Sequence, residues 1–395
     1  MAKRKKFKKP FAPLYYPALW LCALYYRFRY GVTIDRRALK GLRGAALILV
    51  PHTSTKDHLL LGMALRPRRP TFVLSEHFMT RPKLRPTLKL MHVITKKMFC
   101  PDVSTVRNIL RAKASGNLIV LFPEGRLSCY GRTLPVAEGT AALVKRLQLP
   151  VYTVTANGAY LTFPKWAKKS RRGKIHVVAA ALFSPQDLSA LSVEEIEARL
   201  AVAMAHDDEQ AMDGVAYRCR DMTLGLDGIL YRCPRCQAEF TLSTRDGHIT
   251  CPCGLDATLN EYYRLEGAPF ERINDWFLWQ QNRIRLTERL ESPVRVGAVD
   301  ERGNMDFAAG EGRVTLDGER FTFEGTVFGE PLSFVRATAT LGAFPITVAQ
   351  EFDVYYGGKL YYFYPRPDRR QVVKWVSYLD RVNQERKPVP QPPQP

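Results

Sequence analysis

The chain has 395 residues, of which 46% are hydrophobic, so it holds enough apolar material for two or three domains with buried cores. This excludes a small disulfide-stapled scaffold and an intrinsically disordered chain. Its 59 lysines and arginines exceed its 38 acidic residues by 21. A surplus of this size points to an anionic partner: a membrane surface, nucleic acid, an acidic carrier protein or a phosphorylated substrate.

Residues 1–30 combine a basic cluster with an aromatic apolar run. Six lysines and arginines lie within residues 3–9, and the apolar stretch 11–26 holds Pro13 and Pro17. A membrane-spanning helix needs about 20 apolar residues, so this segment is too short to cross a bilayer. A helix beginning near Pro17, with Trp20 at headgroup depth, is expected to lie in the interface of an anionic leaflet. The alternative is a disordered basic tail followed by an ordinary packing helix.

Cysteine usage predicts a reducing compartment. Four of the eight cysteines are scattered, and the other four form two tight pairs, which is metal spacing rather than a disulfide framework. No small-residue cleavage site follows the basic start, so no secretory signal peptide is expected. We therefore expect a peripheral or monotopic location at the cytoplasmic face of the cell membrane.

Residues 31–206 alternate short apolar runs with helical periodicity, which predicts an α/β domain with a mostly parallel sheet. The expected strands are 45–50, 71–74, 117–122, 151–155 and 174–180. The expected helices include 104–114, 135–147 and 193–205. Ser192 and Glu195 form a capping box that opens the last of these helices.

The run HDDEQAMDG near residue 207 breaks this pattern. Beyond residue 290, short alternating segments between Gly-rich turns predict a β-rich domain over 290–387, which ends in an amphipathic helix at 369–386. The expected strands are VRVGAV, GRVTLD, RFTFEG, LSFVRA, ITVAQE and KLYYFY. Six or seven strands closed by a helix resemble a pleckstrin-homology-like (PH-like) barrel. The Pro-rich tail 388–395 is expected to be disordered.

Two cysteine pairs within residues 228–258 have the spacing of a metal site. Cys233 and Cys236 are followed, after 14 residues, by Cys251 and Cys253, and strand-like segments flank both pairs. This predicts a zinc ribbon with four thiolate ligands. The second pair is C-x-C rather than C-x-x-C, so His248 remains an alternative ligand. Four cysteine ligands leave no open coordination position, so the zinc is expected to be structural.

A histidine and an aspartate, His52 and Asp57, follow the first strand of the α/β domain as H-x4-D. The carboxyl ends of strands are where sites form in such sheets. A histidine held there by an aspartate can act as a general base, because the carboxylate fixes its tautomer and stabilises the imidazolium. Five residues apart, the pair does not share a helical face, so His52 must lie in the loop before the helix. The alternative is a histidine that only caps that helix.

A second polar motif, Phe122-Pro123-Glu124-Gly125-Arg126, follows another strand. Glycine lets the backbone approach a ligand closely, and the arginine guanidinium suits forked contacts with phosphate oxygens. Glu124 can accept a hydrogen bond from a substrate hydroxyl or orient a basic side chain. The alternative is a surface turn with an ordinary Glu–Arg pair.

The two motifs in this order resemble N-H-x-S-x-x-D and F-P-E-G of the glycerolipid acyltransferase family, the 1-acylglycerol-3-phosphate and lysophospholipid O-acyltransferases. The resemblance covers about residues 30–205. It implies that His52 and Asp57 are the catalytic pair and that Ser54 binds substrate. It assigns the glycerophosphate-binding motif to Phe122, Pro123, Glu124 and Gly125, and a later apolar V-P motif to Leu149-Pro150-Val151.

Three departures from the family pattern concern the acceptor more than the reaction. Pro51 replaces the usual asparagine before the histidine. Arg126 comes one position earlier than in F-P-E-G-T-R-S, as in lysophosphatidylethanolamine-type acyltransferases. An intermediate G-x-x-F/I-x-x-R motif is poorly kept in HVITKKMF, where Lys96 or Lys97 takes the place of its arginine as a phosphate contact.

The resemblance implies a membrane-associated enzyme of phospholipid biosynthesis or remodelling. It would move an acyl group from an acyl thioester, carried by coenzyme A or acyl carrier protein, to the free hydroxyl of a lysophospholipid. Two other functions stay open: a nucleic-acid-binding zinc-ribbon protein and a non-catalytic lipid-binding scaffold. Basic residues crowd the N-terminal segment and first domain rather than the ribbon, which argues against nucleic acid. The presence of both His52 and Asp57 argues against the scaffold.

Overall fold

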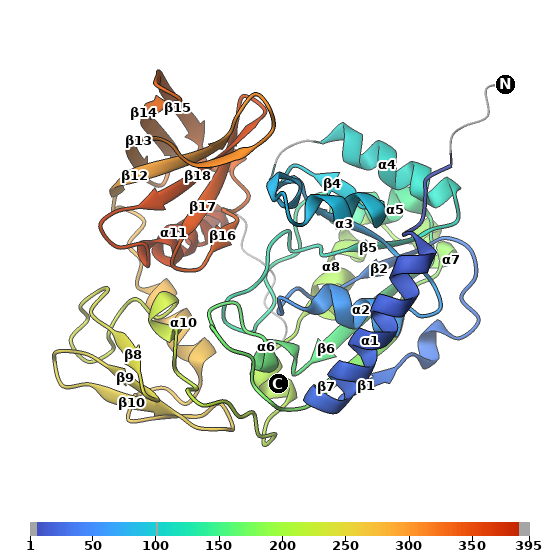
Figure 1. The fold of residues 1–395 in the computed structure, drawn as a ribbon, viewed down its shortest axis with the longest axis horizontal. Helices are drawn as coiled ribbons and strands as arrows, with labels where there is room; N and C mark the ends of the chain where they lie inside the picture. The colour runs from blue at the N-terminus through green and yellow to red at the C-terminus, as the bar shows by residue number, and fades with distance from the viewer. Residues whose placement is uncertain (1–5, 100–101, 387–395) are drawn as a thin grey trace. The chain divides into compact units, whose positions relative to one another are not determined.

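The structure, a computed structural model, describes residues 6–99 and 102–386, which form two compact units (Figure 1). Unit 1 holds most of the chain up to Tyr217, and unit 2 holds the remainder together with segments 98–100 and 166–169. The first three residues of the predicted basic cluster, 3–5, and the predicted tail 388–395 lie outside the described residues.

A seven-stranded sheet forms the centre of unit 1, in the order β1-β7-β6-β2-β5-β3-β4. Its strands are β1 (Val32–Asp35), β2 (Ala46–Leu49), β3 (Thr71–Ser75), β4 (Ile94–Lys96), β5 (Leu118–Leu121), β6 (Val151–Asn157) and β7 (Ile175–Phe183). Every neighbouring pair is parallel except β6 and β7. The predicted mostly parallel α/β sheet is confirmed. The short strands β1 and β4 were not predicted.

Helices cover both faces of this sheet (Figure 1). In β2, Ala46 and Ile48 face one apolar cluster while Leu47 and Leu49 face the other. Side chains alternate along a strand, so a strand covered on both faces is apolar at every position. One cluster contains α1 (Ala12–Tyr30) and α2 (Asp57–Ala64), and the other α4 (Val103–Ala114), α5 (Thr140–Leu147) and α8 (Val193–Met204). The shorter helices are α3 (Arg85–Leu90), α6 (Ala159–Thr162), α7 (Pro185–Ala190) and α9 (Asp208–Ala211).

Two predicted helix starts are wrong, and one is confirmed. Helix α5 begins at Thr140 rather than 135, because Gly139 before it has a left-handed φ of 79°. Helix α1 begins at Ala12 rather than near Pro17. Pro13 fits its first turn, where the missing N–H costs no helical bond, and Pro17 lies inside the helix. The capping box of Ser192 and Glu195 opens α8 as predicted.

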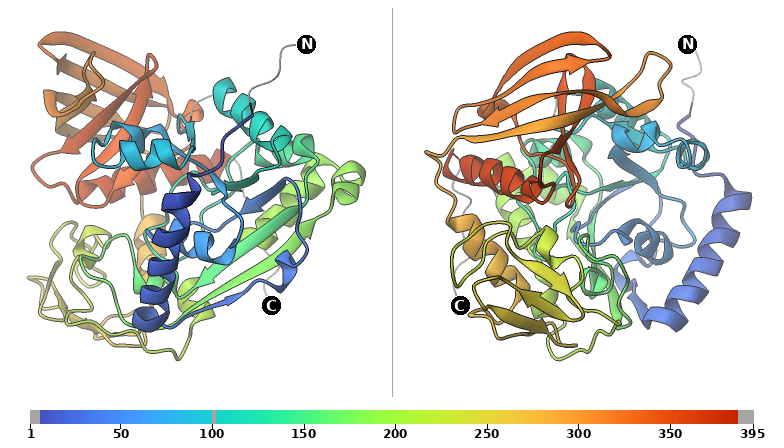
Figure 2. Two further views of the ribbon diagram at one scale, coloured as in Figure 1. Left: turned by 45° about the vertical axis from the view of Figure 1, so that its right-hand side comes forward. Right: turned by 60° about the vertical axis from the view of Figure 1, so that its left-hand side comes forward.

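Helix α1 packs one side against α2 and leaves the other exposed. Gly62 of α2 allows the close approach, since a Cβ there would lie 3.1 Å from Leu19 and 3.5 Å from the Tyr15 hydroxyl. In the right-hand view of Figure 2, α1 lies at the periphery of its unit. Among the residues that the structure describes, no helix has the length and apolar character needed to cross a membrane.

Unit 2 begins with a four-stranded antiparallel sheet in the order β11-β10-β9-β8. Its strands are β8 (Ser243–Arg245), β9 (His248–Thr250), β10 (Asp256–Leu259) and β11 (Leu265–Glu266), and α10 (Ile273–Asn282) follows. Trp276 of α10 donates its indole N–H to the Arg232 carbonyl at 3.0 Å. The Gln280 side chain accepts from the Tyr231 N–H at 2.9 Å and donates to the Ile229 carbonyl at 2.6 Å. Helix α10 therefore anchors the chain just before the first cysteine pair.

The rest of unit 2 is a seven-stranded antiparallel sheet closed by a helix, so the predicted β-rich region is confirmed (Figure 2). The order is β15-β14-β13-β12-β18-β17-β16. The strands are β12 (Leu290–Val299), β13 (Met305–Leu316), β14 (Arg320–Val327), β15 (Glu330–Ala337), β16 (Ile346–Thr347), β17 (Glu351–Tyr356) and β18 (Lys359–Pro365). The ITVAQE segment supplies only the two residues of β16, and β17 was not predicted. The predicted closing helix is α11 (Gln371–Arg386), whose apolar residues Val372, Val373, Trp375, Val376, Leu379 and Val382 are all buried.

Candidate active site

Three adjacent parallel strands bring polar groups to one edge of the unit 1 sheet. His52 follows β2, Glu124 follows β5 on one side of it, and Gly158 follows β6 on the other. Because parallel strands end at the same edge, segments separate in sequence meet there. This edge is the candidate active site.

His52 lies in the loop between β2 and α2, and Asp57 is the first residue of α2. The His52 Nδ1 atom lies 2.9 Å from Asp57 Oδ2, which also accepts from the Ser54 N–H at 3.0 Å. The Asp57 side chain is 2% exposed and that of His52 is 25% exposed. A buried carboxylate thus holds a partly exposed imidazole, as the predicted loop position requires.

The environment of this pair sets its protonation chemistry. Burial raises the pKa of Asp57, while the hydrogen bond and charge of His52 and the Ser54 N–H act in the opposite direction. When Nδ1 carries the proton shared with Asp57, Nε2 of His52 is the free basic nitrogen. The arrangement can therefore accept a proton from a hydroxyl placed at Nε2.

Glu124 contacts the backbone of the His52 loop. Its Oε1 accepts from the His52 N–H at 2.7 Å, and its Oε2 accepts from the Leu134 N–H at 2.8 Å. The side chain is 4% exposed, and burial raises its pKa to about 8 against the effect of these two hydrogen bonds. The sequence motif predicts that Glu124 accepts from a substrate hydroxyl or orients a basic side chain. In the structure both of its oxygens are used to join two loops.

The rest of the Phe122–Arg126 motif forms a tight turn around the same loop. Gly125 has a φ of 75°, a conformation that favours glycine, and its N–H donates to the Phe122 carbonyl at 3.1 Å. The Phe122 and His52 rings lie 4.2 Å apart between centroids. Pro123 is buried, and its carbonyl accepts from the Ala137 N–H at 2.8 Å. Arg126 is half-buried, and its charge acts to lower the pKa of Glu124.

Ser54 lies away from solvent. It is fully buried, its N–H donates to Asp57, and its hydroxyl accepts from the Lys56 N–H at 3.3 Å. The turn that brings Asp57 to His52 therefore uses polar groups of Ser54, and the substrate contact that the resemblance implies stays a prediction.

Two further predicted segments lie apart from His52. Leu149-Pro150-Val151 precedes and begins β6, so it lies at the opposite edge of the sheet. Lys96 ends β4, three strands from β2, which at about 4.8 Å per strand is about 14 Å along the edge. Burial lowers the pKa of Lys96, and the Lys97 N–H donates to Asp102 at 3.1 Å. Any contact of these lysines with an acceptor is therefore remote from the imidazole.

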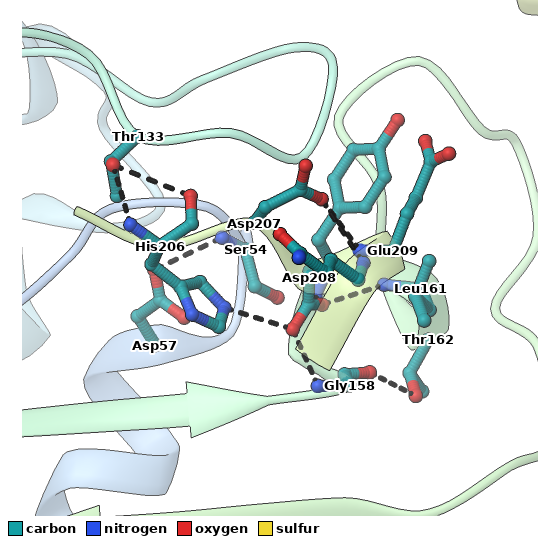
Figure 3. Close-up of polar contacts among 12 residues, drawn as sticks. Ser54, Asp57, Thr133, Gly158, Leu161, Thr162, His206, Asp207, Asp208 and Glu209 are labelled. Carbon is teal, nitrogen blue, oxygen red and sulfur yellow. Dashed lines mark hydrogen bonds and ion pairs between the residues drawn. The ribbon is translucent and has the colours of Figure 1, made fainter. Parts of the chain in front are cut away.

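A second histidine–aspartate pair, not predicted from the sequence, lies in the HDDEQAMDG run. His206 Nε2 lies 3.0 Å from Asp208 Oδ1, and Asp208 accepts from backbone N–H groups after β6 (Figure 3). The only signal in the sequence was a histidine two residues before an aspartate in an acidic run.

The four paired cysteines of unit 2 form a compact cluster. Their sulfur atoms all lie within 4.8 Å of one another, with Cys233–Cys253 at 3.6 Å and Cys236–Cys251 at 3.8 Å. Four thiolates around zinc at about 2.3 Å would lie about 3.8 Å apart, so this donor set fits a tetrahedral metal site. The alternative ligand His248 is instead 2.7 Å from Asp256, through its Nδ1. The cluster could bind a metal through the four cysteines alone.

Comparisons with known proteins agree with the motifs. Residues 32–157 match the family model described as Acyltransferase. A 1-acyl-sn-glycerol-3-phosphate acyltransferase from Cocos nucifera is 30% identical over 84 residues, which cover 21% of this chain and 26% of that protein. One from Limnanthes alba is 25% identical over 181 residues, which cover 45% of this chain and 62% of that protein. The chain therefore spans less than two thirds of the length of each of these relatives.

A solved structure was also found to be similar. The 1-acyl-sn-glycerophosphate (LPA) acyltransferase from Thermotoga maritima aligns with a TM-score of 0.41 and 18% sequence identity, covering 49% of this chain and 76% of that chain.

The matched segment contains both the His52–Asp57 pair and the Phe122–Arg126 motif. Residues 32–157 are therefore an acyltransferase domain. This segment is similar in sequence to the two glycerolipid acyltransferases named above.

Proposed function

We propose that the protein is an O-acyltransferase that moves a fatty acyl group from an acyl thioester to the free hydroxyl of a lysophosphatidate-type lysophospholipid. The observation that carries the proposal is the His52–Asp57 pair, 2.9 Å apart at the carboxyl edge of the sheet. It lies within the segment that matches the acyltransferase family. The names of the two relatives support 1-acylglycerol-3-phosphate as the acceptor class.

In the proposed step, the acceptor hydroxyl gives its proton to Nε2 of His52 while its oxygen attacks the thioester carbonyl carbon. The carbon–oxygen ester bond forms, the carbon–sulfur bond breaks, and the leaving thiolate takes the proton from His52. Asp57 stabilises the transient imidazolium and fixes the orientation of the ring. The carrier of the thioester is coenzyme A or acyl carrier protein, and no enzyme nucleophile is needed.

The acceptor phosphate needs cationic partners in this proposal. Arg126 lies in the turn after β5, and β5 is the strand next to β2, which leads to His52. Of the predicted phosphate contacts, Arg126 therefore follows the strand closest to that of His52. Its forked guanidinium suits phosphate oxygens. Lys96 and Lys97, farther along the same edge, would contact a more distant part of the headgroup.

The exposed face of α1 supports attachment to an anionic membrane surface. Its large apolar side chains lie mainly on the side away from α2, while Lys6, Lys8 and Lys9 precede the helix and Arg27 and Arg29 lie in its last turn. Apolar insertion and attraction to anionic lipid both favour an interfacial position. The exposed apolar residues are Leu14, Tyr16, Trp20, Leu21, Leu24, Tyr25 and Phe28.

This arrangement suits an enzyme of phospholipid biosynthesis and lipid metabolism whose acceptor resides in the bilayer. A peripheral position at the cytoplasmic face also agrees with reduced cysteines. We assign a structural zinc to Cys233, Cys236, Cys251 and Cys253, where four thiolates would complete its coordination and leave it no part in acyl transfer.

The test is acyl transfer by the purified protein, with radiolabelled acyl-CoA and acyl-acyl-carrier-protein as donors and several lysophospholipids as acceptors. We expect transfer to 1-acylglycerol-3-phosphate or a related lysophospholipid by the wild type and background transfer by His52→Ala. Absence of transfer by the folded wild type with every donor and acceptor would contradict the proposal and favour a lipid-binding scaffold.

A further inference from the structure

A second buried histidine–aspartate pair lies at the edge of the sheet that carries His52. The His206 and Asp208 side chains are 8% and 0% exposed, and His206 Nε2 lies 3.0 Å from Asp208 Oδ1. The step described above does not use either group. A pair of this kind, hidden from solvent beside a proposed general base, calls for a physical explanation.

The backbone ties His206 to the loop that supports His52. The Thr133 N–H donates to the His206 carbonyl at 2.9 Å, and the His206 N–H donates to the Thr133 hydroxyl at 3.0 Å (Figure 3). The next residue, Leu134, donates its N–H to Glu124, whose other oxygen accepts from the His52 N–H. Residues distant in sequence are thus held in one hydrogen-bonded assembly.

The Asp208 side chain is surrounded by hydrogen-bond donors, most of them from the backbone. Its two oxygens accept from the N–H groups of Gly158 at 2.6 Å, Tyr160 at 2.7 Å and Leu161 at 3.2 Å, in addition to His206. Hydrogen bonds from several backbone N–H groups favour the charged form of a carboxylate. The hydrogen bond and charge of Asp208 favour a protonated imidazole at His206.

The other groups around His206 are also acidic. In Figure 3, its ring has Nε2 directed to Asp208 and Asp57 on its other side. Burial lowers the pKa of His206, but the hydrogen bond and charge of Asp208 and the charges of Asp207 and Asp57 raise it above the ordinary value. The Arg132 guanidinium lies 2.6 Å from the Asp207 carboxylate and offsets its charge. The acidic neighbours of His206 that do not pair with Arg132 in this way are Asp57 and Asp208.

Asp57 and Asp208 affect one another as well. The charge of Asp208 acts to raise the pKa of Asp57, in addition to the larger effect of burial. Two buried like charges repel strongly where little water screens them. A cation between the two carboxylates reduces that repulsion.

We propose that His206 is a positioning residue of the acyl-transfer site, whose imidazolium between Asp208 and Asp57 keeps Asp57 ionised as the partner of His52. The inference rests on the proposed function. His206 acts through Asp57 and does not touch the reacting atoms.

The proposal fixes the sign of a pH effect. Removing the positive charge of His206 takes away a cation that stabilises the neighbouring carboxylates. Asp57 then binds a proton more readily. Asp57 must be ionised to support His52, and without the nearby cation the carboxyl group, whose pKa burial already raises, becomes ionised only at a higher pH. The acidic limb of the kcat/KM–pH profile therefore moves upward.

The variant His206→Gln keeps a side-chain donor for Asp208 but removes the charge. We expect its acidic limb to move upward by about one pH unit, with the rate recovering at high pH. The matched control is His248→Gln in unit 2, which alters an exposed pair with Asp256 at 2.7 Å and should leave the limb in place. A folded His206→Gln protein whose rate changes equally at every pH, or not at all, would overturn the proposal.

A measurement independent of activity separates this inference from the proposed function. In the ¹⁵N-histidine NMR spectrum of the wild type, the His206 ring, assigned by its loss in His206→Gln, should have both nitrogens protonated at pH 7.5. The Asp57 carboxyl resonance, followed by ¹³C NMR, should titrate at a higher pH in the variant than in the wild type. A neutral His206 ring refutes the inference even if acyl transfer is found. A protonated ring with the Asp57 shift supports it even if no acyl transfer is detected. If the variant does not fold, the His206 ring is assigned through its own backbone resonances in the wild type, and its protonation state then decides the matter.

Discussion

The two units each gather polar or ionisable side chains at one place, but the two sites are organised in opposite ways. In unit 2, four cysteine sulfurs lie within 4.8 Å of one another, so the proposed zinc would have all four of its coordination positions filled by protein. In unit 1, buried carboxylates bind backbone N–H groups and hold one imidazole that remains 25% exposed. A structural site satisfies its own groups, whereas a site for chemistry keeps one reactive group accessible and uses its buried groups to support it.

The largest expected effect concerns the cysteine cluster of unit 2. Cys233→Ser should remove nearly all bound zinc, because three thiolates bind it much more weakly than four, and a small ribbon has too little core to fold without its metal. Elemental analysis should find about one zinc per chain in the wild type. Cys219→Ser, which changes a half-buried cysteine outside the cluster, should keep its zinc. Equal zinc in all three proteins would contradict the cluster as a metal site.

The next largest effect concerns the His52–Asp57 pair of unit 1. His52→Ala should lower kcat/KM about 10² to 10⁴-fold, the usual contribution of a general base, with little change in thermal unfolding. The kcat/KM of Asp57→Asn should also fall severely, because the amide no longer selects the required imidazole tautomer.

The double variant His52→Ala/Asp57→Asn should lose about as much as His52→Ala alone, because residues that act as a unit are not additive. Additive losses, measured in the same kinetic assay, would mean that the two side chains work separately.

A smaller effect concerns the exposed face of α1. Replacing Trp20 and Phe28 by serine should weaken binding to anionic vesicles about tenfold or more, since burying one such side chain is worth about 1.5–3 kcal/mol. The fold should be preserved because both side chains are more than half exposed. Val202→Ser, at an exposed position of α8, is the control and should bind normally in a sedimentation assay. Unchanged sedimentation of the double variant would exclude this face as the anchor.

The smallest effect sharpens the role of the buried carboxylates. Glu124→Gln leaves one of two backbone N–H groups without a good acceptor and should cost about 1–3 kcal/mol of unfolding free energy. The pKa of Glu124 is raised to about 8, so the folded wild type binds an extra proton between its ordinary value and pH 8. Its contribution to stability is therefore present at low pH and lost as the pH rises through that window.

The glutamine does not titrate, so the Tm of Glu124→Gln should fall less between pH 5 and pH 8 than that of the wild type. Equal slopes in the two thermal-unfolding series would show that Glu124 does not account for the pH dependence.

Features encoded by neighbouring residues were accessible from the sequence. The strand patterns near β2 and β5, the capping box of α8 and the spacing of the two cysteine pairs each depend on short-range geometry. The His52–Asp57 spacing is also local, and the loop position that it requires is the one that the structure has. Such signals survive in a single sequence because the interacting groups lie within a few residues of one another.

Other features were decided only by the tertiary structure, because their partners are distant in sequence. Glu124 binds the His52 N–H across 72 residues, and Asp208 binds the Gly158 N–H across 50. No local pattern distinguishes a glutamate that binds backbone from one that faces a substrate, and none reveals that an acidic run packs beside a histidine site. The difference is burial: only the closing of the sheet edge removes water from Glu124, Asp57 and Asp208, and that loss of water gives their charges and hydrogen bonds their effect.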